Sequence, residues 1–108
     1  MGGLLIPEPI APSMELLCER AVSVVWEVLA RRKLVPDCRR FTVKAYQHFQ
    51  WPGTIVCFLD MLVDREGFVE GKVATFSIPE NTVTRSGMLK VVNAEIDSIE
   101  ADLRNPGG

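Results

Sequence analysis

A chain of 108 residues is long enough to bury the core of one domain without metals or disulfides. Hydrophobic residues make up 47% and charged residues 24%, a balance that argues against both a disordered and a membrane-spanning chain. The 12 Lys and Arg against 14 Asp and Glu give a net charge of -2, which excludes a chain-wide attraction to nucleic acid or anionic lipid and predicts a small acidic protein.

The first twelve residues predict an extended arm, because they hold three prolines and several large aliphatic residues without helical spacing. They lack the basic leader and the long apolar stretch of a signal peptide, so we expect a cytoplasmic protein. The cysteines agree with a reducing compartment, since Cys18, Cys38 and Cys57 are odd in number and match neither a disulfide framework nor a CxxC metal site.

Residues 14 to about 34 predict the most regular helix of the chain. Ser13 is suited to the N-cap, and Pro36 prevents the helix from continuing. The apolar residues recur at spacings of three and four and share one broad face. They are Met14, Leu17, Cys18, Ala21, Val22, Val24, Val25, Val28 and Leu29.

Three strands are predicted after this helix. Apolar and polar residues alternate over 40–49, which indicates an amphipathic strand. Residues 54–63 are nearly all apolar and favour β structure, which predicts a central strand covered on more than one side. A third strand with weaker alternation is expected over 68–78.

Two hairpin loops are predicted to join these strands. Trp51-Pro52-Gly53 fits a type II turn, in which Gly53 would take a positive φ. Residues 64–67 predict the second loop, and Gly71 in the third strand suggests a bulge.

A second helix is predicted over 88–104, followed by a flexible tail at 105–108. Five apolar residues at alternating spacings of three and four form a narrow seam along it: Leu89, Val92, Ile96, Ile99 and Leu103. Two alternatives stay open for this seam. It contacts a second chain, or it packs on the sheet of its own chain.

The elements together predict an α+β fold, a two-layer domain over 13–104 with the order helix, three-stranded antiparallel meander, helix (α-β-β-β-α). In element order alone the layout is similar to small acidic secretion chaperones and to phage or bacterial accessory proteins. It is also similar to double-stranded RNA-binding domains, although the lysine-rich start of their second helix is here Thr84 to Lys90, with two basic residues.

Binding features lead the functional interpretation. Trp26 and Leu16 lie off the apolar face of the first helix, which suggests interface anchors, with cover by the arm or the other helix as the alternative. Together with the second-helix seam they predict a partner-binding surface, used by a protein partner or in a homodimer. A basic collection is the candidate anion site: Arg31, Arg32, Lys33, Arg39, Arg40 and Lys44.

Catalytic signals are weak. The chain has no GxGxxG, GxxxxGK or GxSxG pattern, and its single histidine and scattered cysteines do not have the spacing of a zinc site. Cys38, beside Arg39 and Arg40, and His48 are the residues that an unrecognised enzyme would use. We therefore expect no catalytic residue, no cofactor and no metal, and a non-catalytic protein-binding, adaptor or chaperone-like domain; the alternative is nucleic-acid binding through the basic collection.

Overall fold

The computed structural model describes residues 13–32 and 38–104; the expected arm at 1–12 and tail at 105–108 lie outside the described residues. Helix, three strands and helix follow one another in the predicted order. The elements are α1 (Met14–Arg31), β1 (Cys38–Gln47), β2 (Ile55–Arg65), β3 (Phe68–Ile78), a short 3-10 helix, η2 (Glu80–Thr82), and α2 (Arg85–Arg104). The predicted α+β class and the α-β-β-β-α order are confirmed.

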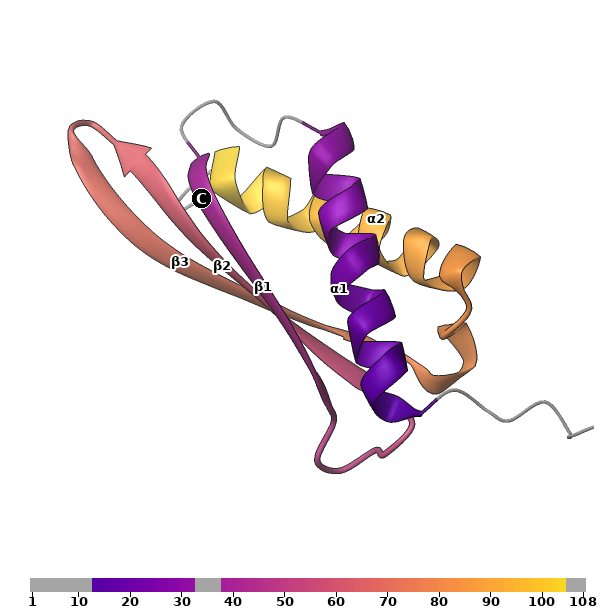
Figure 1. Cartoon of the computed structure of the whole chain (residues 1–108). Coiled ribbons are helices and arrows are strands. Elements are labelled where there is room, and N and C mark those ends of the chain that lie inside the picture. Colours follow the sequence, from indigo (N-terminus) through magenta and orange to yellow (C-terminus); the bar gives the residue numbers. More distant parts are fainter. Residues whose placement is uncertain (1–12, 33–37, 105–108) are drawn as a thin grey trace, which may run out of the picture.

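The strands form one antiparallel sheet in the order β1-β2-β3, and both helices lie on the same side of it (Figure 1). β2 is central and pairs along its whole length with both neighbours, so that Leu59 lies opposite Val43 of β1 and Ala74 of β3. Side chains opposite one another in an antiparallel pair share a face of the sheet. The register therefore assigns every described strand residue either to the helix side or to the other side.

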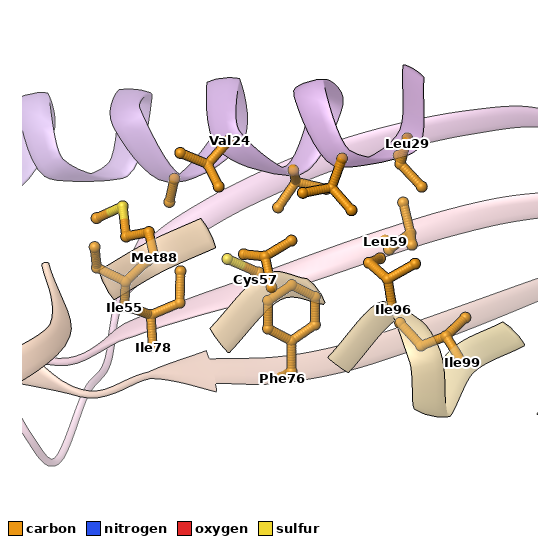
Figure 2. Close-up of a cluster of buried hydrophobic side chains, with 14 of the residues drawn as sticks. Val24, Leu29, Ile55, Cys57, Leu59, Phe76, Ile78, Met88, Ile96 and Ile99 are labelled. Carbon is orange, nitrogen blue, oxygen red and sulfur yellow. The ribbon is translucent and has the colours of Figure 1, made fainter. Parts of the chain in front are cut away.

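The core lies between the helices and the helix side of the sheet, and Figure 2 shows side chains of both helices meeting those of β2 and β3. Every second residue of β2 is buried there, because successive side chains of a strand point to opposite faces. The buried residues of the strands are Ile55, Cys57, Leu59, Met61, Val63, Phe76 and Ile78, and they pack against Leu17, Ala21, Val24, Val25, Val28 and Leu29 of α1 and Met88, Val92, Ile96, Ile99 and Leu103 of α2.

Both helices are capped at their N-termini by hydroxyl side chains. The amide of Leu16 donates to Ser13 Oγ over 3.2 Å, as predicted, and the amide of Gly87 donates to Thr84 Oγ1 over 3.2 Å. These bonds satisfy backbone donors that have no partner within a helix. The predicted boundaries shift accordingly: the Thr84 cap starts α2 at Arg85 instead of residue 88, and α1 ends at Arg31 because Arg32 is extended, with φ -120° and ψ 140°.

The turns differ from the prediction in two places. The amide of Thr54 donates to the carbonyl of Trp51, which closes the expected turn, but Gly53 does not take a positive φ, so the turn is not type II. The predicted bulge at Gly71 is also wrong, since the β2–β3 register runs without interruption. The irregularity lies in β1 instead, between Cys38 and Arg40.

The β2–β3 hairpin turns on two residues with positive φ, Glu66 at 48° and Gly67 at 88°. Two such residues between paired strands are typical of a type I′ turn, whose twist matches that of the strands. The glycine avoids the steric penalty that a Cβ meets in the left-handed region.

Gly67 and Gly71 form a matched pair for testing this conformation, because neither has an atom within 4 Å of an added Cβ and only Gly67 has a positive φ. We expect Gly67→Ala to lower the free energy of unfolding by about 1 kcal/mol through backbone strain. Gly71→Ala should leave it unchanged or slightly higher. Urea unfolding followed by circular dichroism measures both, and equal effects of the two substitutions would contradict the assigned turn.

Candidate protein interface

The side of the sheet that faces away from the helices has no covering element among the described residues (Figure 1). We call this surface the open face. Its residues, from β1 through β2 to β3, are Arg40, Thr42, Lys44 and Tyr46; Val56, Phe58, Asp60, Leu62 and Asp64; Val69, Gly71, Val73, Thr75 and Ser77. The prediction that the second strand is covered on more than one side therefore fails within the described chain.

Apolar side chains are prominent on the open face. Val56, Phe58 and Leu62 of β2 are only partly buried by their neighbours in the sheet. On the outer strands Tyr46 and Val69 are exposed, and Val73 keeps 65% of its surface accessible. Several exposed apolar side chains gathered on one uncovered face are typical of an interaction surface.

One end of the open face is aromatic. The rings of Tyr46 and Phe58 meet edge to face, with centroids 5.8 Å apart. In the β1–β2 loop the His48 ring stacks on Phe49 at 5.1 Å and lies 4.5 Å from the Trp51 ring. We call these five residues the aromatic end. Phe49 and Trp51 are exposed.

His48 fixes the shape of the loop at this end. Its Nδ1 accepts hydrogen bonds from the amides of Gln50, over 3.0 Å, and Trp51, over 3.2 Å. Its own amide donates to the carbonyl of Thr54 over 2.8 Å. The ring therefore contacts both Phe49 and Trp51. Together with Phe49 it lines a hollow of about 490 Å³, to which Tyr46, Phe58, Thr75 and Ser77 also contribute. This arrangement gives His48 a structural role, since its Nδ1 is occupied.

The charges of the open face balance. Arg40 and Lys44 of β1 carry two positive charges, and Asp60 and Asp64 of β2 carry two negative charges. Asp60 lies opposite Thr42, so its diagonal neighbours on β1 are the two cations. Such a surface complements another surface of mixed sign, not a polyanion.

The seam of the second helix lies within the core of its own chain. Val92, Ile96, Ile99 and Leu103 are buried in the core that α2 shares with α1 and the sheet, and Leu89 is partly buried against it. Of the two alternatives left open by the sequence, packing on the chain's own sheet is the one observed. The five residues were predicted as partner-binding, and the burial of four of them removes those four from the surface.

The two predicted anchors of the first helix are accessible. Leu16 is 56% exposed and Trp26 is 44% exposed, so no described element covers either of them fully. Both remain candidates for partner binding, on the side of the molecule that carries the helices.

The predicted basic collection is divided between the two sides of the molecule. Arg31 pairs with Glu27 over 3.0 Å, and Arg32 pairs with Asp97 and donates to Asn93 of α2 over 2.9 Å. Arg40 and Lys44 belong to the open face. Lys33 and the side chain of Arg39 lie outside the described residues. The structure thus does not gather the four described cations into one patch.

The cysteine thiols, which were candidates for reactivity, are the next groups that the structure describes. Burial raises the pKa of the Cys57 thiol to about 12, with Cys18 adding to the shift, and burial also raises the pKa of Cys18. The side chain of Cys38 lies outside the described residues. Among residues 13–32 and 38–104, no three His, Cys, Asp or Glu side chains come together in a way that would hold a metal ion.

Sequence reasoning missed the open face and its aromatic end. Tyr46, Phe58 and Trp51 carry no binding signal in the sequence beyond the strand and turn patterns in which they lie. The available signal was the apolar character of β2, interrupted only by Asp60 before Asp64, which favours cover on both sides, while only two helices are predicted to supply it.

Comparisons with protein-family models, with curated proteins and with solved structures find no match for this chain. In the part of the chain that the structure describes, neither helix has the combined length and apolar character needed to cross a membrane.

Proposed function

We propose that this chain is a non-catalytic protein-binding domain that forms a homodimer through its open face. The observation that carries the proposal is the uncovered apolar side of the sheet, above all β2, whose residues on both faces are largely apolar. A strand of that composition is typical of a sheet covered on both sides. A second copy provides the missing cover in a closed two-fold arrangement, the commonest form of oligomer.

The size of the open face supports a second copy as its occupant. Strands of 10, 11 and 11 residues, at about 3.4 Å per residue and about 4.8 Å apart, span a face of about 500 Å². Two such faces bury about 1,000 Å², the threshold area of a biological interface. The exposed Phe49 and Trp51 add to that area, and aromatic residues are the usual anchors of an interface.

The charges support the same occupant. Because cations stand on β1 and carboxylates on β2, one copy can set Arg40 and Lys44 near the carboxylates of the other. A charge-balanced surface also reduces the attraction of a polyanion.

Nucleic-acid binding is the second candidate, and one observation favours it. Tyr46 and Phe58 present their rings on a sheet face, where such rings stack unpaired bases in single-strand-binding domains. The basic collection gives it less support, because Arg31 and Arg32 are engaged within the chain and Arg85, at the start of α2, pairs with Glu27. If the chain binds nucleic acid, the purified protein should carry nucleic acid that is removed at high salt.

A cytoplasmic location and an accessory role complete the proposal. The odd number of cysteines supports a reducing compartment, and both cysteines whose side chains are described, Cys18 and Cys57, are free thiols.

The dimer is tested by Val69→Lys/Val73→Lys, which places two charges on exposed positions of the open face. Val69 and Val73 lie opposite Asp64 and Asp60, so the folded monomer accommodates the lysines. Their burial in a dimer should weaken it by about 3 kcal/mol, roughly a hundredfold in Kd. Light scattering after size-exclusion chromatography should report twice the chain mass for the wild type and the chain mass for the variant.

Leu16→Lys/Trp26→Lys is the matched control, because it replaces two exposed apolar residues of α1 and changes the net charge equally. It should remain dimeric. Dissociation of this variant alone would move the interface to the first helix, and a wild-type monomer with bound nucleic acid would favour the second candidate.

A further inference from the structure

A groove lies between the N-terminal half of α1 and the C-terminal half of β1, with a volume of about 500 Å³. Its floor is formed by Met14, Cys18 and Val22 of the helix and Ala45 of the strand. Glu15 and Glu19 stand along its rim and are exposed. We call this the edge groove. Tyr46 and Gln47 complete its lining, and Tyr46 is the one lining residue that the groove shares with the open face and the aromatic end.

The strand beside the groove has a free edge. β1 has a single strand neighbour, β2, among the described residues. In an antiparallel pair, every second residue of an outer strand directs its amide and carbonyl away from the partner. Those groups can accept a further strand, so a free edge is normally protected by charged residues or by a covering element.

The protection of this edge is one-sided. Arg40 and Lys44 project to the open face, while Phe41, Val43 and Ala45 on the helix side are apolar and only partly buried. A strand placed along β1 would find apolar contacts on the helix side, in the edge groove, without meeting a β1 cation there.

The rim defines the charge of the occupant. Glu15 and Glu19 bring two negative charges to the edge groove, and the nearby cation of α1, Arg20, donates to the carbonyl of Val83 over 2.8 Å. An occupant with lysine or arginine is therefore favoured over an acidic one.

We propose that the edge groove binds an extended peptide segment of another protein, with apolar and basic residues together at the alternate positions that face the groove, which adds to β1 as a fourth strand. The inference rests on the proposed protein-binding function and names the class of partner. Backbone hydrogen bonds along β1 supply affinity, the groove takes the apolar side chains, and the two glutamates select for positive charge.

Cys18 provides a direct probe, because its thiol lines the groove and is partly exposed, whereas Cys57 is buried and its pKa is raised to about 12. The probe ligand is a synthetic peptide as long as β1, at 10 residues. Its groove-facing alternate positions carry valine and lysine in turn, with threonine at the positions between them. At about ten times its Kd, this peptide should slow alkylation of Cys18 by iodoacetamide about tenfold, since about one site in eleven stays free. Mass spectrometry of the digested protein measures labelling at Cys18, with Cys57 as the unreactive reference.

Two comparisons identify the binding mode. A peptide of the same sequence with alternate amides N-methylated cannot complete the strand and should give no protection. Glu15→Lys/Glu19→Lys should lower affinity about tenfold, and Glu95→Lys/Asp102→Lys on α2, with the same change in net charge, should not. Equal binding of the methylated peptide, or equal losses in both variants, would overturn the proposal. Binding that appears only after removal of residues 1–12 would also overturn it, because the chain's own residues would then fill the groove.

Light scattering on the same samples separates this inference from the proposed dimer. A dimer whose Cys18 the peptide leaves unprotected would overturn the edge groove and preserve the open-face dimer. Protection accompanied by dissociation into monomers would support the groove, and the Val69→Lys/Val73→Lys variant would then decide whether the dimer contact is the open face or β1.

Discussion

Ile96→Asp is expected to abolish folding. Ile96 has no exposed surface and lies in the core among residues of α1, β2 and β3. A carboxylate there would be buried without a partner, or would have to take up a proton at a pH where carboxyls are ionised. Either penalty is several kcal/mol, and a domain of this size has a total stability of about 5–15 kcal/mol. Far-UV circular dichroism should show a largely unfolded chain at 25 °C.

Two further substitutions make this result specific. Ile96→Ala, which only removes volume, should lower the free energy of unfolding by about 2–5 kcal/mol in urea titrations. Ser98→Asp, on the same helix but at an exposed position, should change it by less than about 0.5 kcal/mol. A folded, monomeric Ile96→Asp protein would contradict the structure, because it would mean that the seam of α2 contacts another chain and not its own sheet.

Stability should decline at alkaline pH because of Cys57. Its pKa is raised from 9.0 to about 12 by burial, with Cys18 contributing, so between these values the unfolded chain loses a proton that the folded chain retains. The contribution of this thiol to the free energy of unfolding is complete below pH 9. It falls by about 1.4 kcal/mol for each pH unit above that value, which gives a loss of about 2 kcal/mol at about pH 10.5. Urea midpoints at pH 8 and about pH 10.5 measure the loss.

Lysine and tyrosine also titrate in this range, so the comparison is with Cys57→Ala. That variant should be less stable at pH 8, because it leaves a small cavity, but it should lose about 2 kcal/mol less than the wild type on going to about pH 10.5. Parallel losses in both proteins would show that Cys57 does not carry the pH dependence.

The fold could be predicted because local signals agreed with one another. Residues 68–78 form β3 with the predicted bounds, and Ser13 caps α1, since each depends on alternation or on side-chain chemistry close in sequence. The α+β order followed from the change of hydrophobic period from 3.6 to 2 and back. The end of α1 and the start of α2 each differ from the prediction by three residues. The extended backbone of Arg32 ends α1 and the side chain of Thr84 caps α2, and neither feature can be read from the hydrophobic periodicity.

The candidate interface was less predictable because it depends on which face remains uncovered. The narrow seam of α2 is compatible with a coiled coil and also with a helix that packs on a sheet. Only the burial of Ile96 and Ile99 in the core with α1 and the sheet decides between these two arrangements. The sequence groups Arg31 and Arg32 into one basic patch. In the structure Arg31 pairs with Glu27 one helical turn away, and Arg32 pairs with Asp97 through a tertiary contact. No sequence spacing reveals that Arg40 and Lys44 lie on the opposite side of the sheet.

The two helices that cover the sheet come from opposite ends of the described chain, and this affects how the protein emerges from a ribosome. The three strands are joined by short loops and can pair as soon as β3 has left the exit tunnel. The residues of α2 that complete the core, down to Leu103, follow later. In that interval the nascent sheet has its open face uncovered and its helix side covered only by α1, so this is the stage of biosynthesis at which aggregation or capture by a chaperone competes most strongly with folding.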